Sequence, residues 1–248
     1  MESVSLKNAA VAYPSTPGSV VLDGLCAEIP LCSHTLVLGG NGSGKTALAR
    51  LLAGLDSPTA GSILWPEGKE EEQISKSAHL LRSGVVFEQP EFQFQGFSVR
   101  EELCAGLLYH GVESSRAEEL AGTAAASYGI EDLLENTLHS LCYSAKLAVL
   151  VSSFLLLRPR LLVLDFSLAE LDREFLKRLF SVCMEKKSPA LVVLSRRAED
   201  YFLMENAGVY VLNSGNMDKL AADRDVPSTL QLLRDAGIAM PTESSPPG

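Results

Sequence analysis

The chain has 248 residues, of which 46% are apolar, and a formal net charge of −10 at neutral pH. This length and apolar content suffice for one sizeable domain, or for one domain with an inserted subdomain. A nucleic-acid-binding surface needs clustered lysine and arginine, and the sequence has no long basic run, so we expect no nucleic-acid partner. The longest apolar run, residues 147–157, is too short to span a bilayer and predicts a buried helix.

The five cysteines are scattered along the chain, and no C-x-x-C pair occurs among them. This spacing argues against a disulfide framework and against a zinc site, and it fits a reducing cytosol. The first ten residues, MESVSLKNAA, lack the basic region and apolar core of a signal peptide, so we expect no secretion signal there.

Apolar periodicity and turn residues predict the following elements in chain order. The first half is expected to hold strands over 3–13, 19–30 and 34–40, a helix over 46–54, and strands over 61–66 and 83–90. The acidic stretch EGKEEEQ, residues 67–73, is expected to be a solvated loop. Next come expected helices over 99–111, 115–129 and 145–157, a strand over 160–166, a helix over 175–187, a strand over 190–195, and a strand with a hairpin turn over 209–216.

This order predicts the fold class and the domain plan. Strands that alternate with helices imply an α/β core with a mainly parallel sheet, with an antiparallel β portion near the N-terminus. We expect a single domain over 3–240, with its core over about 3–90 and 158–222, and an inserted helical subdomain over about 91–157. The tail at 241–248, rich in proline and serine, is expected to be disordered.

Residues 39–46 read GGNGSGKT and match the P-loop pattern G-x-x-x-x-G-K-[ST]. The match lies between a predicted strand and a predicted helix, which is the structural context that this motif requires. Lys45 is expected to reach the β- and γ-phosphates of a nucleotide, and the Thr46 hydroxyl is expected to bind Mg²⁺. The backbone N–H groups of the loop are expected to converge on phosphate oxygens. The predicted nucleotide-binding residues of the loop are Gly39, Gly40, Asn41, Gly42, Ser43, Gly44, Lys45 and Thr46. The alternative is a glycine-rich turn with an incidental lysine.

Asp165 ends the apolar run LLVLD at 161–165, which predicts a buried parallel strand. A carboxylate at the C-terminal end of a strand near the P-loop is how P-loop proteins hold Mg²⁺, directly or through water. We therefore predict Asp165 as a metal ligand, and the alternative is a turn or helix-capping residue.

With these motifs in place, the sequence resembles an ABC transporter ATPase over about residues 3–240. Tyr13 stands where that family stacks an aromatic ring on adenine. The stretch VVFEQPEFQFQGFSVREEL, residues 85–103, is similar to the loop segment of energy-coupling factor and cobalt-type importer ATPases, and LQLLRDAGIAMP, residues 230–241, is similar to their C-terminal segment. The resemblance implies ATP and Mg²⁺ as cofactors.

Four positions depart from the pattern of the resembled family. The catalytic glutamate falls on Phe166, and the signature LSGGQ falls on LCYSA at 141–145. The switch histidine falls on Arg196, and the loop glutamine falls on Glu88, with Gln89 one place along. Losing the base, the signature and the switch together indicates a site that binds ATP and hydrolyses it poorly.

Several alternatives stay open from the sequence. Glu88 could serve as the base of an active ATPase, or it could ligate Mg²⁺ together with Thr46 and Asp165. Glu170 lies four residues past Phe166 and is expected to point toward a partner subunit. Arg196, with its neighbour Arg197, is either a solvated pair at the end of a strand or a contact to phosphate.

The resemblance also implies partners and a location. We expect a second ABC ATPase subunit, with a heterodimer favoured over a homodimer because LCYSA cannot build two good composite sites. We also expect a membrane-embedded coupling protein, which the aromatic residues of 92–94 would face unless they belong to the core. The chain would then lie in the cytoplasm, on the inner face of the cell membrane. A non-transport, ATP-gated regulatory or scaffold protein is the remaining alternative.

Overall fold

The computed structural model describes most of the chain, and the following account is confined to those residues. They are residues 2–12, 20–67, 70–183, 188–204, 206–220, 233–234 and 237–238. Tyr13, most of the segment 230–241 and the tail at 241–248 lie outside this set, so the predictions made for them stay predictions.

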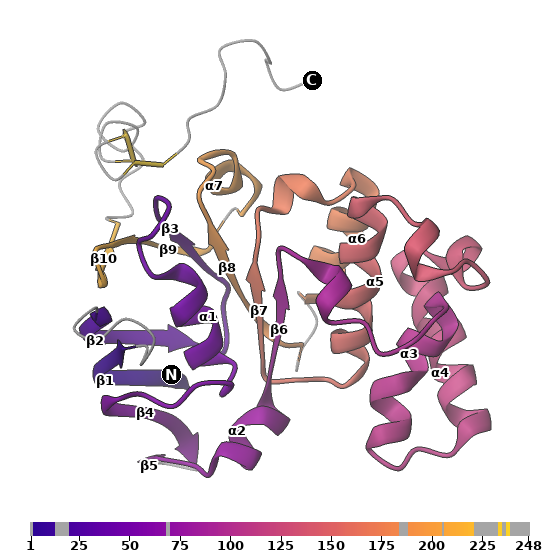
Figure 1. The fold of residues 1–248 in the computed structure, drawn as a ribbon, viewed down its shortest axis with the longest axis horizontal. Coiled ribbons are helices and arrows are strands. Elements are labelled where there is room, and N and C mark those ends of the chain that lie inside the picture. Colours follow the sequence, from indigo (N-terminus) through magenta and orange to yellow (C-terminus); the bar gives the residue numbers. More distant parts are fainter. Residues whose placement is uncertain are drawn as a thin grey trace.

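A four-stranded sheet forms the N-terminal part of the fold, with strand order β2-β1-β4-β5 (Figure 1). Its pairs β1–β2, β1–β4 and β4–β5 are all antiparallel, which confirms the antiparallel β portion predicted near the N-terminus. The strands are β1 (Ser3–Ala12), β2 (Val20–Pro30), β4 (Ala60–Glu67) and β5 (Glu70–Glu72).

The acidic segment after β4 is not the loop that we predicted. Glu70–Glu72 form β5, which pairs antiparallel with Trp65–Glu67 of β4. β5 is the last strand in the sheet order, so it is an edge strand, and glutamates are tolerated there because they discourage pairing with another chain.

A six-stranded sheet with order β10-β9-β3-β8-β7-β6 forms the centre of the fold. Neighbouring strands from β9 to β6 run parallel, and only β10 is antiparallel to its neighbour. The sheet is therefore mainly parallel, as predicted. Its strands are β3 (Thr35–Leu38), β6 (Ser83–Phe87), β7 (Leu161–Asp165), β8 (Ala190–Ser195), β9 (Gly208–Asn213) and β10 (Asn216–Lys219).

Alternate residues of the central strands face two separate cores. On β7, Leu161 and Val163 pack with the N-terminal sheet and α1 (Lys45–Leu52), whereas Leu162 and Leu164 pack with the helical half of the molecule. Figure 1 shows α1 between the N-terminal strands and the central sheet, and α5 and α6 on the other side of that sheet. Because both faces are covered, the strands are apolar at nearly every position.

Three helices form the insertion between β6 and β7: α3 (Val99–Tyr109), α4 (Ser114–Tyr128) and α5 (Tyr143–Leu156). Ser98 and Glu101 form a capping box that begins α3, and Gly129, with φ of 70°, ends α4. α5 is buried along most of its length, from Leu147 to Val151 and at Leu155, which confirms the deep-core interpretation of its apolar sequence.

The shorter helices complete the fold. α2 (Lys76–Arg82) leads into β6, α6 (Arg173–Cys183) links β7 to β8, and α7 (Glu199–Leu203) follows β8. Four 3-10 turns lie in the loops: η1 (Pro90–Phe92), η2 (Glu131–Leu133), η3 (Leu138–Ser140) and η4 (Leu168–Glu170). In a parallel sheet the loops after the carboxyl ends of the strands gather at one edge, and there β3, β6, β7 and β8 place the residues of the site.

Candidate functional site: a phosphate-binding loop

The loop of residues 39–44 joins β3 directly to α1, as the P-loop motif predicts. Lys45 is the first residue of α1, and its ammonium donates hydrogen bonds to the carbonyls of Gly39 (2.9 Å) and Gly40 (2.7 Å). The lysine therefore folds back over the loop and lies where a phosphate group would sit against the backbone N–H groups.

At two positions of this loop, any side chain would clash with neighbouring atoms. A Cβ on Gly39 would lie 2.5 Å from Ser43 Oγ and 2.7 Å from the carbonyl of Leu212, so a side chain there would push the loop away from β9. Gly44 has φ of 104°, and its Cβ would lie 2.8 Å from a methyl carbon of Leu22. The tight, backbone-lined cradle therefore depends on these two positions.

Beside the loop, Lys45, Thr46 and Asp165 lie close enough to one another for charges and hydrogen bonds among them to shift the pKa values of Lys45 and Asp165. Burial raises the pKa of Asp165, although a hydrogen bond from Thr46 and the charge of Lys45 oppose the rise. Burial lowers the pKa of Lys45; Asp165 and Glu88 oppose that shift, while Arg196 adds to it. The Thr46 hydroxyl and the Asp165 carboxylate are hydrogen-bonded to each other, so the two predicted Mg²⁺ ligands lie side by side.

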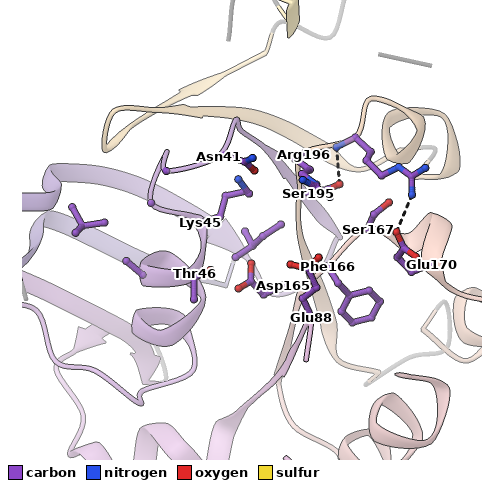
Figure 2. A pocket seen from close by; sticks show the side chains of 16 residues that line it. Asn41, Lys45, Thr46, Glu88, Asp165, Phe166, Ser167, Glu170, Ser195 and Arg196 are labelled. Carbon is purple, nitrogen blue, oxygen red and sulfur yellow. Dashed lines mark hydrogen bonds and ion pairs between the residues drawn. The ribbon is translucent and has the colours of Figure 1, made fainter. Parts of the chain in front are cut away.

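A cavity of about 390 Å³ opens in front of the P-loop (Figure 2). Glu88 and Arg196, which the sequence places after β6 and β8, both line it. Arg196 therefore lies both at the end of β8 and on the wall of the cavity. The side chain of Gln93, in the loop after β6, instead bonds to the strand itself: its amide accepts from the N–H of Phe87 and donates to the carbonyl of Val85.

Phe166 follows Asp165 directly, and only 4% of its surface is exposed. Figure 2 shows its ring directed away from Lys45 and Thr46, and it packs in the apolar core shared with the helical half. Phe166 therefore lines the cavity with apolar atoms, and the position after Asp165 offers no carboxylate.

Glu170 lies on the wall of this cavity, and its expected orientation toward a partner subunit stays a prediction. Its Oε1 accepts a hydrogen bond from Arg197 Nη1 at 2.9 Å. This ion pair joins the loop after β8 to the loop after β7. Both arginines of the pair 196–197 therefore line the cavity, and Arg197 also binds Glu170.

Asp200 supports the site from behind the cavity wall, and sequence reasoning missed it. It is fully buried, and its Oδ1 accepts hydrogen bonds from Ser167 Oγ (3.1 Å) and from the backbone N–H of Ala169 (3.3 Å). The Ser195 hydroxyl also bonds to it. Asp200 therefore ties together the ends of β7 and β8, and no sequence signal marks it, because an aspartate early in a short helix is ordinary.

The segment LCYSA at 141–145 leads into α5 and begins its first turn. Cys142 precedes the helix without a side-chain capping bond, and Leu141 is buried. The Tyr143 hydroxyl donates a hydrogen bond to the backbone carbonyl of Glu88 at 2.7 Å, so this residue reaches its own subunit's cavity loop.

The residues present fit a nucleotide with Mg²⁺. The fit rests on the backbone cradle that a Cβ at Gly39 or Gly44 would fill, and on the hard oxygen donors of Thr46 and Asp165. Bound Mg²⁺ would neutralise phosphate charge, and Lys45 would hold phosphate oxygens. An adenine contact from Tyr13 stays a prediction, because that residue lies outside the described part of the chain.

The fold and this loop define a P-loop nucleotide-binding protein. The profile of the ABC transporter family matches residues 22–168, which is more than half of the chain. The chain therefore belongs to the ABC transporter family, and it is an ATP-binding subunit related to the energy-coupling factor transporter ATPases.

Three relatives illustrate this relationship. An energy-coupling factor transporter ATP-binding protein, EcfA, of onion yellows phytoplasma is 30% identical over 216 residues, covering 86% of this chain and 77% of the relative. A putative ABC transporter ATP-binding protein of a Nostoc species is 29% identical over 232 residues, covering 92% and 84%. EcfA1 of Mycoplasmoides gallisepticum is 26% identical over 241 residues, covering 96% and 84%.

Solved structures agree with the fold. Superposition on cbiO1 of Clostridium perfringens, which is part of the ABC transporter complex cbiONQ, gives a TM-score of 0.74 at 22% identity and covers 94% of this chain and 93% of that one. A nucleotide-free ATP-binding cassette from an ABC transporter gives 0.75 at 17% identity, covering 96% and 100%. Among the described residues, no helix has both the length and the apolar character needed to cross a membrane.

Proposed function

We propose that this chain binds MgATP at its P-loop as a subunit of an importer of the energy-coupling factor type, with weak or absent hydrolysis of its own. The observation that carries the second half of this proposal is Phe166. Attack on a γ-phosphate needs an oriented water, and the position that follows Asp165 holds a buried aromatic ring. ATP would then bind and persist, since Lys45, Thr46 and Asp165 remain in place.

A titration with MgATP tests the binding half of the proposal. Replacing Lys45 with alanine removes a charge-assisted contact to phosphate, so the Lys45→Ala variant should bind MgATP about 10-fold to 100-fold more weakly than the wild type. The Lys177→Ala variant is the matched control, because Lys177 is exposed on α6 and pairs only with its helix neighbour Glu174 among the contacts described for it. Equal affinities of wild type and Lys45→Ala would contradict the proposal.

A membrane-embedded coupling protein is the partner that the surface supports best. An apolar groove of about 350 Å³ runs between α2, α3 and the end of α5, and Leu81 on its rim is 65% exposed. Phe92, after β6, is 84% exposed, whereas Phe94 packs against the core, so only part of the 92–94 segment faces outward. Apolar patches of this kind mark docking surfaces.

Copurification tests this partner. Leu81→Glu should reduce recovery of the chain with the membrane fraction that holds its coupling protein, whereas Lys177→Glu should not. If the chain never copurifies with an integral membrane protein, the non-transport regulatory alternative is favoured instead.

A second candidate is an active ATPase that uses Glu88 as its base. The observation in its favour is that Glu88 lines the cavity beside Asp165. Under this alternative, the wild type would turn ATP over measurably and Glu88→Gln would abolish that turnover; under the main proposal the wild type itself stays at or near the background rate.

A further inference from the structure

Two side chains on the first turn of α5 reach across to the loop that follows β6. Tyr143 donates its hydroxyl to the carbonyl of Glu88 at 2.7 Å, and Lys146 Nζ lies 2.8 Å from Glu91 Oε1. Each contact joins residues 55 positions apart in the chain. The helical insertion is thus fastened to the cavity loop at two points within the same subunit.

The position of Glu88 gives the first of these contacts its importance. Phe87, the last residue of β6, pairs with Asp165 on β7, so Glu88 is the next residue beyond the partner of Asp165. Figure 2 shows the side chains of Glu88 and Asp165 close to each other at the cavity. Because the main chain of Glu88 is held by Tyr143, the place of its carboxylate depends on a residue of the helical insertion.

Tyr143 is a hydrogen-bond donor at neutral pH. Burial, together with the negative charges of Glu88, Glu170 and Glu91, raises the pKa of Tyr143 to about 12. A phenol with an ordinary pKa of about 10 already keeps its proton at neutral pH, so the donation to the Glu88 carbonyl does not depend on this shift. Lys146 is only 14% exposed, and its hydrogen bond lowers the pKa of Glu91, so the second contact stays charged at neutral pH as well.

We propose that Tyr143 is a positioning residue that acts through Glu88. Its hydroxyl fixes the main chain of Glu88, and this sets the Glu88 carboxylate beside Asp165, in the cavity that Thr46 also lines, toward the Mg²⁺ of a bound nucleotide. The start of α5 therefore serves the nucleotide cavity of its own subunit. The inference rests on the proposed binding of MgATP. Because coupling is reciprocal, a nucleotide whose Mg²⁺ binds Glu88 should also strengthen the hydrogen bond between Tyr143 and the Glu88 carbonyl.

A double-mutant cycle in nucleotide affinity tests this role. The proteins are the wild type, Tyr143→Phe, Glu88→Ala and the double variant, each titrated with MgATP and with ATP in excess chelator. Tyr143→Phe removes only the hydroxyl, so MgATP affinity should fall about threefold to tenfold, as expected for one neutral hydrogen bond. The affinity for Mg²⁺-free ATP should stay unchanged, and the effect should vanish in the Glu88→Ala background, because alanine leaves no side-chain oxygen for Tyr143 to position.

A purely structural role of Tyr143 gives a different result. The loss would then be equal with and without Mg²⁺, and equal in both backgrounds, and either finding would overturn the inference. The matched control is Tyr109→Phe on α3, a tyrosine that is 89% exposed, which should change neither affinity. Lys146→Met breaks the second contact and should weaken MgATP binding in the same direction.

Amide hydrogen exchange of the nucleotide-free protein separates this inference from the proposed function. Tyr143→Phe should speed exchange of backbone amides within residues 88–95, whether or not the protein binds ATP. If the wild type binds MgATP and Tyr143→Phe matches it, the inference alone fails. If the wild type binds no MgATP, the proposed function fails, and the role of Tyr143 toward Mg²⁺ fails with it.

Discussion

Phe166 illustrates at the residue scale why the missing base cannot be restored by one substitution. Phe166 is 4% exposed and belongs to the apolar core that also contains Leu168 and Leu171. A glutamate placed on this backbone would lose that packing and would either bury its charge or turn toward the cavity. The aromatic ring is thus part of the core that supports the site, and no carboxylate remains at this position.

Replacing Phe166 with glutamate should lower the free energy of unfolding by about 3–5 kcal/mol and leave phosphate release at its background rate. Phe166→Leu is the control, since an aliphatic side chain of similar size should cost less than about 1.5 kcal/mol. Urea denaturation and a phosphate-release assay measure the two effects. A stable Phe166→Glu protein with new turnover would contradict this prediction, because it would show that a carboxylate at position 166 can act as the base.

Asp200 should make stability depend on pH in a defined direction. Burial raises its pKa above the ordinary value of 3.8, so between these two values the folded state holds more protons than the unfolded state. The contribution of Asp200 to stability is therefore present below pH 3.8 and is lost as the pH rises through the raised pKa.

Asp200→Asn removes this titration and keeps an oxygen that can accept from Ser167 and Ala169. We expect the variant to gain stability relative to the wild type as the pH rises from about 4 through the raised pKa. Chemical denaturation of both proteins at several pH values measures the difference. Parallel curves for the two proteins would show that Asp200 does not titrate in this window.

At the scale of elements, the start of α3 is set by a local interaction. Ser98 Oγ accepts from the N–H of Glu101 at 3.2 Å, and Glu101 Oε2 accepts from the N–H of Ser98 at 3.3 Å. Ser98→Ala should lower the free energy of unfolding by about 1 kcal/mol, because a capping bond is lost. Ser127→Ala, at an exposed position late in α4, is the control and should stay within about 0.5 kcal/mol of the wild type. Similar losses in both variants would contradict a specific cap.

The elements that sequence predicted well are those with a strong local signal. The apolar strands of the central sheet and the P-loop between β3 and α1 were predicted, because periodicity and the GGNGSGKT motif depend on neighbouring residues only. β5 was missed, since its glutamates reflect its position at a sheet edge. The contacts of Tyr143 with Glu88 and of Asp200 with Ser167 were also missed, because residues 55 and 33 positions apart meet only after folding.

At the scale of the whole molecule, the departures from the family pattern predict how subunits pair. A homodimer would contain two sites with LCYSA in place of LSGGQ, whereas a heterodimer with an intact ABC subunit would place that partner's signature against this chain's P-loop. Light scattering should therefore detect a dimer that forms with MgATP when an intact ABC subunit from the same organism is added, and little dimer from this chain alone. A tight, MgATP-dependent homodimer would contradict the heteromeric arrangement.

The central claim, that the chain binds MgATP and hydrolyses it weakly or not at all, is tested most directly by phosphate release from the isolated chain under saturating MgATP. We predict a rate equal to that of Lys45→Ala, together with bound nucleotide that remains ATP when the wild type is recovered by rapid filtration. The reason is that Lys45, Thr46 and Asp165 bind MgATP, whereas Phe166 supplies no base to activate the attacking water. Turnover near about 1 s⁻¹, the low end of ordinary enzymes, that Lys45→Ala abolishes would contradict the account.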